Sequence, residues 1–364
     1  MHKACREAIN SGGTMSALPT ATVQAADGVK NQSAAFALLD LIQGSVVTQA
    51  IYVAASLGIA DILAGGPLTA TEIADKAEAD ADAIHRLLRL LSGFAVFAER
   101  GDGRFELTPM AESLRGDAPD SMRGIALLMG LPLFWEEWGH LLTSVRTGEA
   151  SMPVVRGMGA QEFLMANPEY AMSFFQGMGS LSGPETAPVV AAYDFSRFGT
   201  IVDVGGGRGA LLAGILRRSP GSRGVLFDAP HGTADAPQVL EAAGVTGRCT
   251  VENGSYFESV PAGGDAYLLK HTLHDFTEEQ SLAVLKNIRD AMNPDGTLFV
   301  VEYVLPGNNT PHLGNVIDLW LLLLLGARER TRDQYAELLA RGGFTLTRVI
   351  PTASPVSIIE AVPV

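Results

Sequence analysis

The chain has 364 residues, 47% of them hydrophobic, and a formal net charge of -14 at pH 7. A chain of this length can form two domains with large cores. Its acidic charge argues against nucleic acid and membrane surfaces as partners, because binding either would require local basic patches and none is visible. Cys5 and Cys249 form no disulfide framework and no signal peptide is visible, so we expect a cytoplasmic protein.

Residues 1–33 are polar and rich in Ala, Ser and Gly, and we expect a disordered segment. Residues 34–120 predict helices followed by a short ribbon. One helix begins with capping chemistry at Thr69 and Glu72, and a second helix is expected over 80–91.

Two strands are expected over 94–99 and 104–108, joined by Gly101-Asp102-Gly103. Helices followed by this hairpin outline a winged helix, which alone would indicate DNA binding. Residues 61–123 nevertheless contain 12 acidic and 7 basic residues, a poor match to a phosphate backbone. A structural or dimerisation module is therefore the better interpretation.

Residues 121–185 predict a helical linker, with long helical patterns over 123–145 and 161–179 that are rich in Met, Phe and Trp. Stripes of this kind are more often ordinary core than a binding surface. The strongly apolar run 320–325 is much too short to cross a bilayer and is expected to be a buried helix.

From residue 186 onward, strand and helix patterns alternate, which predicts a mostly parallel, doubly wound sheet with its ligand at the carboxyl ends of the strands. Five strands are expected, over 200–204, 224–227, 249–252, 266–271 and 297–303. A final pair over 345–350 and 355–362 predicts a hairpin at the C-terminus.

The first of these strands ends in Asp203 and leads into Gly205-Gly206-Gly207-Arg208-Gly209 before a helical pattern. Glycines in a strand-to-helix turn let a ligand approach the backbone closely. The pattern can be aligned with a dinucleotide fingerprint, but an acid at the strand end would repel a pyrophosphate. Asp203 instead suits a cationic ligand, such as the ammonium and sulfonium groups of S-adenosylmethionine.

Asp228 ends the second strand, 19 residues after Gly209. An acid at this point suits the ribose hydroxyls of a nucleoside. It supports a nucleoside cofactor without distinguishing a dinucleotide from S-adenosylmethionine.

The motifs downstream make a family resemblance specific. After the glycine turn come Phe227-Asp228-Ala229-Pro230-His231, Leu268-Leu269-Lys270-His271-Thr272-Leu273-His274-Asp275-Phe276, Met292-Asn293-Pro294-Asp295-Gly296 and Glu329-Arg330-Thr331. In this order they resemble the class I S-adenosylmethionine-dependent small-molecule O-methyltransferases, which include plant phenylpropanoid and bacterial antibiotic-tailoring enzymes. The match extends from about residue 35 to the C-terminus.

The resemblance implies an α/β fold: a Rossmann-like methyltransferase domain with a seven-stranded, mostly parallel sheet and a C-terminal antiparallel hairpin. It also implies a mainly helical, winged-helix dimerisation domain over 34–120, a substrate lid over 121–185, a cofactor-binding catalytic domain over 186–364 and a homodimer. The expected substrate is a small aromatic or polyketide-like acceptor. The substrate-binding candidates are Trp135, Phe163, Phe175, Met178, Asn315 and Asp318.

His274 is the expected catalytic base. A phenol with a pKa of roughly 10 is largely protonated at neutral pH, and a histidine with a pKa of roughly 6.5 can accept its proton. By resemblance, Glu302 and Glu329 flank this histidine, orient its ring and stabilise the imidazolium that forms. Asp275 completes the catalytic set.

The cofactor site is expected to include Lys270, which in the family contacts the cofactor. Gly254-Ser255-Tyr256-Phe257 departs from the usual Gly-Asp-x-Phe, so Ser255 loses a charge-assisted bond near the adenine. The full set of cofactor-binding candidates is Asp203, Gly205, Gly207, Asp228, Ala229, Ser255, Tyr256, Phe257, Lys270 and His271.

Three alternatives remain open. A His-x-x-His-Asp cluster with Glu302 could recruit a metal for C-methylation of a 2-oxo acid, although strand alternation would point His271 and His274 to opposite faces. We expect no metal. A relative that binds the cofactor and catalyses hydroxylation or decarboxylation is the second alternative. A DNA-binding regulator built on the winged helix is the third.

Overall fold

The computed structural model describes residues 33–364, so the segment 1–32, for which we expect disorder, lies outside the described residues. The chain divides into two compact units between Leu114 and Arg115. The helices expected to form a linker and lid therefore belong to the C-terminal unit.

The N-terminal unit contains the predicted helices and hairpin. Its helices are α2 (Ala34–Ile42), α3 (Gly44–Ser56), α4 (Ile59–Ile62), η2 (Leu63–Gly65), α5 (Ala70–Ala77), α6 (Ala81–Gly93) and α7 (Pro109–Glu112). Helix α5 begins with the predicted capping box, in which the Thr69 side chain accepts from the Glu72 amide and Glu72 accepts from the Thr69 amide. The strands β1 (Leu68–Thr69), β2 (Phe97–Glu99) and β3 (Arg104–Leu107) form an antiparallel sheet in the order β1-β3-β2.

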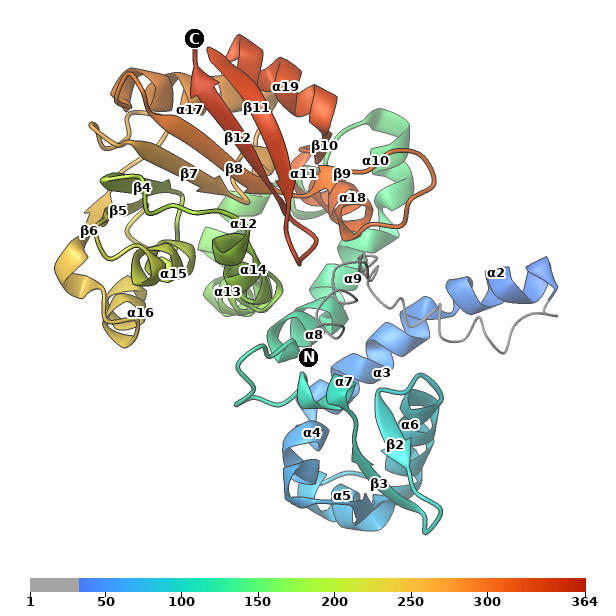
Figure 1. Ribbon diagram of the computed structural model, residues 1–364. Helices are drawn as coiled ribbons and strands as arrows, with labels where there is room; N and C mark the ends of the chain where they lie inside the picture. The colour runs from blue at the N-terminus through green and yellow to red at the C-terminus, as the bar shows by residue number, and fades with distance from the viewer. Residues whose placement is uncertain (1–32) are drawn as a thin grey trace, which may run out of the picture. The chain divides into compact units, whose positions relative to one another are not determined.

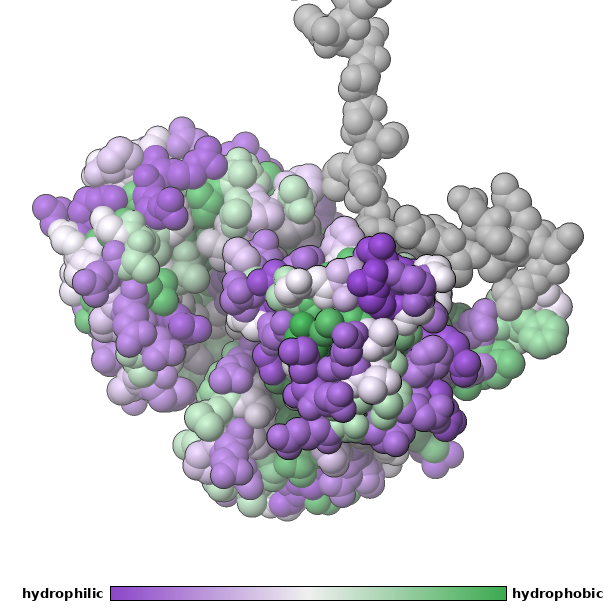
Figure 2. Space-filling model, turned by 90° about the horizontal axis from the view of Figure 1, so that it is seen from below, coloured by the Kyte–Doolittle hydropathy of each residue, from purple (hydrophilic) through white to green (hydrophobic). Residues whose placement is uncertain are grey.

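Helices α2 and α3 expose apolar side chains. Phe36, Leu38, Leu41 and Ile42 are each more than half exposed, and Figure 2 shows the hydrophobic colour on α2 at the right-hand edge. The stretch Ala34–Ser56 is long and apolar enough to cross a membrane by length and composition alone. An exposed apolar helix surface of this kind is also typical of an interface between subunits.

The long helical patterns predicted for the linker are wrong in length, because proline interrupts both. The first becomes α8 (Arg123–Gly130), α9 (Pro132–Gly139) and α10 (Leu141–Thr147), with Leu131 extended before Pro132. The second becomes α12 (Ala160–Ala166) and α13 (Pro168–Ser182). A residue before proline is forced out of the helical region, which ends each preceding helix. Three further helices complete this region: α11 (Met152–Arg156), η3 (Gly183–Glu185) and α14 (Thr186–Ala192).

The predicted sheet is confirmed, with seven strands in the order β11-β12-β8-β7-β4-β5-β6 (Figure 1). The strands are β4 (Thr200–Val204), β5 (Arg223–Asp228), β6 (Cys249–Asn253), β7 (Ala266–Lys270), β8 (Thr297–Glu302), β11 (Phe344–Pro351) and β12 (Ser357–Pro363). Strands β4 to β8 are parallel, and β12 pairs antiparallel with β8 and β11. The C-terminal hairpin is therefore confirmed as well.

Alternate residues of the strands feed two separate cores. Along β8, Leu298 and Val300 join one cluster, while Phe299 and Val301 join the other. Helices α17 (Glu278–Ala291) and α19 (Arg332–Arg341) cover the first face, and α14 and α15 (Ala210–Arg218) cover the second (Figure 1). Burial on both faces leaves only the ends of the strands open to ligands.

The remaining elements connect these layers. They are α16 (Ala236–Ala242), η4 (Thr246–Arg248), η5 (Leu273–Asp275), β9 (Val304–Leu305), α18 (Leu313–Leu325) and β10 (Arg330–Thr331). Helix α18 contains the apolar run 320–325; Trp320, Leu321 and Leu323 are buried in it, as predicted. The short parallel pair β9 and β10 places residue 329 beside the end of β8.

Candidate active site

The glycine turn between β4 and α15 has the backbone that its composition predicts. Gly205, Gly207 and Gly209 have φ of 71°, 54° and 78°, values that favour glycine. Gly206 meets a different constraint, since a Cβ there would lie 2.5 Å from the Leu226 side chain and 2.6 Å from the Asp203 carboxylate. A Cβ on Gly207 would point into open space.

Asp203 ends β4 as a buried carboxylate. The residue is 1% exposed, and neither carboxylate oxygen has a hydrogen-bond partner among the described residues. Burial raises the pKa of Asp203 to about 7, and the nearby charge of Asp228 adds to this effect. An orphaned acid at this depth is suited to a cationic group of a ligand.

Asp228 lies at the carboxyl end of the neighbouring strand β5. Its Oδ2 accepts from the Gly207 amide at 2.8 Å and its Oδ1 accepts from the Ala229 amide at 2.6 Å. The carboxylate is thus fixed against the glycine turn, with lone pairs left over for hydroxyl donors.

The segment after β6 brings an aromatic group to the same region. Tyr256 packs its ring against Phe257 at 4.8 Å and against Phe276 at 5.5 Å between centroids. Burial and the charge of Asp228 raise the pKa of Tyr256 to about 12. The Ser255 carbonyl accepts the amides of Glu258 and Ser259, which fixes the turn where the family's usual acid is replaced.

Lys270 ends β7, and its charge lowers the pKa of Asp203. Its Nζ lies 2.8 Å from Oε2 of Glu185 and also donates to the carbonyl and hydroxyl oxygens of Ser182. Lys270 is thus held by α13 and η3, and its contact with the cofactor stays a prediction.

Glu185 is a buried hub that sequence reasoning missed. Its Oε2 also lies 2.7 Å from Nε2 of His271, and its Oε1 accepts from the Tyr303 hydroxyl at 2.9 Å. Burial would raise the pKa of Glu185, but the hydrogen bond and charge of His271 and the charge of Lys270 outweigh it and lower the pKa to about 2.

The expectation that His271 and His274 point to opposite faces is wrong. Their rings stack at 5.1 Å between centroids with an interplanar angle of 24°. The reason is the backbone of His271, which has φ of 51° and so ends the strand alternation. The Tyr303 ring also packs against His271, at 5.0 Å between centroids.

His274 lies in η5, just beyond β7, and is buried. Its Nδ1 lies 2.7 Å from Oε1 of Glu329, and its Nε2 lies 3.5 Å from Oδ1 of Asp275. Burial alone would lower the pKa of His274, but the charges of Asp275, Glu329 and Glu302 overcome it and raise the pKa to about 10. Asp275 is 45% exposed, so solvent screens its share of this effect.

Glu302 holds the backbone of this turn rather than the imidazole ring. Its Oε1 accepts three amides, those of Thr272 at 3.1 Å, Leu273 at 2.8 Å and His274 at 3.2 Å. Its Oε2 accepts from the Tyr335 hydroxyl.

Arg330 fixes the turn from the opposite direction. Its guanidinium donates to the Leu273 carbonyl at 3.3 Å and lies over the Tyr335 ring. Arg330 is buried and follows Glu329 directly, so one short segment orients both the ring of His274 and the turn that bears it.

Ligand atoms of His274, Glu302 and Glu329 lie within 4.8 Å of one another, as a metal site would require. Most of these atoms already have partners. His274 Nδ1 faces Glu329, and both oxygens of Glu302 accept hydrogen bonds from the protein. The cluster is better described as a hydrogen-bond network that orients the imidazole.

The six substrate-binding candidates have different surroundings. Phe163 is core: it is buried, stacks edge-on with Tyr170 at 5.5 Å and lies under Arg156, so its assignment as a pocket residue is not supported by its contacts. Asn315 is exposed and donates to the Thr310 carbonyl.

Asp318 accepts from the Glu329 amide at 2.8 Å and so positions the residue that holds His274. Met178 packs partly buried against the core, and Phe175 is 53% exposed. Trp135 has a buried indole Nε1 without a partner among the described residues, as expected of a side chain that awaits an acceptor.

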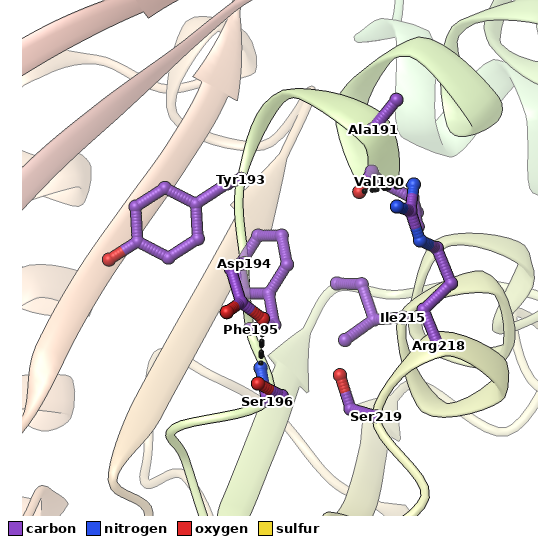
Figure 3. A pocket seen from close by; sticks show the side chains of 9 residues that line it. All are labelled: Val190, Ala191, Tyr193, Asp194, Phe195, Ser196, Ile215, Arg218 and Ser219. Carbon is purple, nitrogen blue, oxygen red and sulfur yellow. Dashed lines mark hydrogen bonds between the residues drawn. The ribbon is translucent and has the colours of Figure 1, made fainter.

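A cavity of about 190 Å³ lies elsewhere, beside the end of α14, the end of α15 and the segment that leads into β4 (Figure 3). Within it, Asp194 accepts from the Ser196 amide at 3.0 Å, and Arg218 and Ser219 line the opposite wall. It adjoins the amino end of β4, whereas Asp203 and the glycine turn follow the carboxyl end. We do not assign it to the site.

The comparisons with known proteins agree with this architecture. The O-methyltransferase domain model matches residues 138–345, and the O-methyltransferase dimerisation domain model matches residues 39–116. The chain therefore belongs to the S-adenosylmethionine-dependent O-methyltransferase family of natural-product tailoring enzymes.

Relatives of known activity cover nearly the whole chain. A phenazine O-methyltransferase of Lysobacter antibioticus is 43% identical, over 90% of this chain and 96% of its own. A mitomycin biosynthesis 6-O-methyltransferase of Streptomyces lavendulae is 38% identical, over 88% of this chain and 92% of its own. The solved structure of CalO1, a methyltransferase in calicheamicin biosynthesis bound to S-adenosylhomocysteine, is 33% identical, with a TM-score of 0.83 over 91% of this chain and 98% of that chain.

Family membership establishes an enzyme that uses S-adenosylmethionine as methyl donor. The orphaned carboxylate of Asp203 and the glycine turn beside it fit that cofactor. Family membership as a methyltransferase therefore argues against a DNA-binding regulator and against a relative without methyl transfer.

Proposed function

We propose that this enzyme methylates a hydroxyl of a small aromatic or polyketide-like natural product, with His274 as the general base. The observation that carries the proposal is the buried pair of His274 and Glu329, joined at 2.7 Å beyond the carboxyl end of β7. Glu329 fixes the ring through Nδ1 and leaves Nε2 as the atom that can take a proton.

The sulfonium of S-adenosylmethionine supplies the methyl group. Asp203 would hold its cationic amino acid moiety, Asp228 its ribose hydroxyls, and Tyr256 with Phe257 would contact its adenine. We retain Gly205, Gly207, Ala229 and Ser255 as the backbone of this site. Lys270 would join it by exchanging its contact with Glu185 for the cofactor.

The raised pKa of His274 has a consequence for the order of events. The raised pKa favours the imidazolium in the free enzyme at neutral pH, and an imidazolium cannot accept a proton. A positive charge brought close to that imidazolium lowers its pKa, because two like charges in a buried site repel each other. His274 therefore becomes competent as a base when the cofactor binds.

The acceptor class is supported by what relatives are named for. One is a 3-amino-4-hydroxybenzoate 4-O-methyltransferase of Streptomyces cremeus, 40% identical, and another a 2,7-dihydroxy-5-methyl-1-naphthoate 7-O-methyltransferase of Streptomyces carzinostaticus, 34% identical. An 8-amino-8-demethylriboflavin N,N-dimethyltransferase at 35% identity shows that nitrogen acceptors also occur among relatives. Oxygen as the methylated atom is thus part of our proposal.

The test is product identification. Full-length enzyme is incubated with S-adenosylmethionine and a panel of hydroxybenzoates, hydroxynaphthoates and hydroxyphenazines, and the methylated position is read by NMR. We expect an O-methyl product and one equivalent of S-adenosylhomocysteine. An N-methyl or C-methyl product would contradict the assignment. Full activity after dialysis against a chelator is the expected result for a metal-free site, and loss of activity restored by metal would support C-methylation instead.

We further propose a cytoplasmic homodimer, supported by the dimerisation domain and by the exposed apolar face of α2. The domain division 34–120, 121–185 and 186–364 is likewise our proposal for how dimerisation, lid and catalysis are distributed. Light scattering of the full chain should give twice the chain mass, and Leu38→Glu with Leu41→Glu should lower it to one. A wild-type mass of one chain would refute the dimer.

A further inference from the structure

Besides the pair of His274 and Glu329, the site contains a second histidine–carboxylate pair. His271 Nε2 lies 2.7 Å from Glu185 Oε2, the same separation as between His274 and Glu329. Both pairs are largely buried, and their imidazoles stack on each other. Glu185 has no part in the methyl transfer proposed for His274, and the geometry of the pair concerns His271.

The contacts of Glu185 determine which nitrogen of His271 carries the proton. Glu185 also faces the ammonium of Lys270 and accepts from the Tyr303 hydroxyl, so it is an ionised acceptor. An ionised carboxylate within hydrogen-bond distance requires Nε2–H as the donor. Burial lowers the pKa of His271, in agreement with a neutral ring. Nδ1 therefore presents a lone pair.

The described part of the chain offers that lone pair no partner. Nδ1 of His271 is buried without a hydrogen bond among the described residues. Three features fix the direction of this nitrogen: the contact of Glu185 with Nε2, the packing of the His274 and Tyr303 rings against the imidazole, and the left-handed backbone of His271. A strained, oriented and unsatisfied acceptor of this kind is typical of a binding site that awaits a donor.

We propose that Nδ1 of His271 accepts a hydrogen bond from a second donor of the acceptor molecule, next to the hydroxyl that reacts at His274. The substrate class is an arene with two neighbouring donors, such as an ortho-aminophenol or a catechol. This inference rests on the proposed function. The ring spacing of 5.1 Å supports it, because two donors on adjacent ring carbons can each reach one of two stacked imidazoles through hydrogen bonds of about 2.8 Å.

The position favours the acceptor over the cofactor. The ring of His271 stacks on the base itself, whereas the residues that fit the cofactor are Asp203 and Asp228 on β4 and β5. We therefore propose the acceptor, and not the cofactor, as the partner of His271.

The first experiment reads His271 directly. In full-length protein labelled with ¹⁵N-histidine, long-range ¹H–¹⁵N correlation identifies the signal of His271 by its loss in His271→Phe. We expect a neutral Nε2–H tautomer, unchanged by S-adenosylhomocysteine and shifted at Nδ1 when 3-amino-4-hydroxybenzoate is added. A shift at Nδ1 with S-adenosylhomocysteine alone would assign the nitrogen to the cofactor and overturn the proposal.

The second experiment measures selectivity. Calorimetry with S-adenosylhomocysteine present compares 4-hydroxybenzoates that carry amino, hydroxyl, methoxy or hydrogen at position 3. We expect the amino and hydroxyl compounds to bind about tenfold more tightly than the other two, and this preference to vanish in His271→Phe. The control His85→Phe makes the same ring change in the N-terminal unit and should keep the preference.

A wild-type enzyme without this preference, including one that binds none of the four, overturns the inference. If His271 had a purely structural role, His271→Phe would weaken the binding of all four compounds equally. The ratio of affinities between donor-bearing and other compounds would then stay unchanged. O-methylation of a hydroxyl without the preference leaves the proposed function standing and removes the inference alone. The binding preference without any O-methyl product would support the inference on His271 and contradict the proposed O-methylation.

Discussion

Nδ1 of His274 lies 2.7 Å from Oε1 of Glu329, and both side chains are buried. The contact joins residues 55 positions apart in the chain, and it exists because β9 and β10 pair in parallel beside the end of β8. The two residues act as a unit, with one carboxylate that orients one imidazole.

Replacement of the base is the first prediction. His274→Ala should lower kcat by about 10² to 10⁴, the range expected for a general base, because no side chain then accepts the proton of the acceptor hydroxyl. Affinity for S-adenosylmethionine, measured by calorimetry, should not fall, because the alanine variant lacks the imidazolium that repels the cofactor's positive charge. A variant that keeps near-normal turnover would mean that proximity alone carries the reaction.

The rate should rise with pH. The raised pKa of His274 keeps the neutral imidazole of the free enzyme scarce at pH 7, so kcat/KM should increase as pH rises toward about 10, whereas kcat, which reports the enzyme with cofactor bound, should rise at lower pH. Asp275→Asn removes one of the charges that raise this pKa, and it should move the rising limb to lower pH by less than about one unit, since Asp275 is half-exposed. A profile that falls over this range would contradict a basic role for His274.

Cofactor binding should release a proton near neutrality. Asp203 has a pKa raised to about 7 by burial, and a cationic ligand favours its ionised form. Affinity for S-adenosylmethionine should therefore improve as pH rises from about 6 to 8. Calorimetry in buffers of different ionisation enthalpy measures the proton released. Asp203→Asn should bind more weakly and with a smaller pH dependence, the remainder coming from His274; equal pH dependence in both proteins would mean that Asp203 does not release the proton.

Glu185 should stabilise the fold at neutral pH and lose this contribution in strong acid. Its folded pKa of about 2 lies below its ordinary value of 4.5, so its stabilisation is fully present above pH 4.5 and is lost as pH falls through 2. The contribution is on the order of 3 kcal/mol. Denaturation by urea at several pH values should show wild type losing more stability than Glu185→Gln between pH 4.5 and 2. Parallel losses would show that Glu185 is not coupled to His271 and Lys270 as described.

Alanine substitutions at the two central glycines of the turn should have different effects. Gly206→Ala places a Cβ against Leu226 and Asp203 and should destabilise the fold, measured as a lower Tm. Gly207→Ala meets open space and should cost only about 1 kcal/mol for its positive φ, yet it should weaken S-adenosylmethionine binding strongly by occupying the cofactor's approach. If Gly207→Ala lowered the Tm more and Gly206→Ala weakened binding more, the cofactor would not approach the turn at Gly207.

The residues that could be predicted from sequence are those whose motif is local. Asp203, Asp228 and His274 each follow a strand directly, and parallel strands bring their carboxyl ends to one edge. The C-terminal hairpin and the capping box of α5 follow from similarly short patterns.

Other features depend on contacts between distant segments. Glu185 precedes His271 by 86 positions in an ordinary Gly183-Pro184-Glu185 turn, and no local pattern distinguishes it from a surface acid. Phe163 shares its spacing with residues that could face a pocket, and only packing against Tyr170 shows that it is core. The helix breaks at Pro132 and Pro168 were visible in the sequence, but the apolar period obscured them.

The turn that bears His274 has no strand partner of its own, yet one carboxylate oxygen of Glu302 accepts its three consecutive amides. Amide protons held in this way cannot exchange with solvent until β8 releases Glu302. Residues 272–274 should therefore exchange deuterium as slowly as the centre of the sheet, although they lie at its edge. The catalytic turn would then be among the last parts of the enzyme to open, and inactivation by heat would coincide with global unfolding rather than precede it.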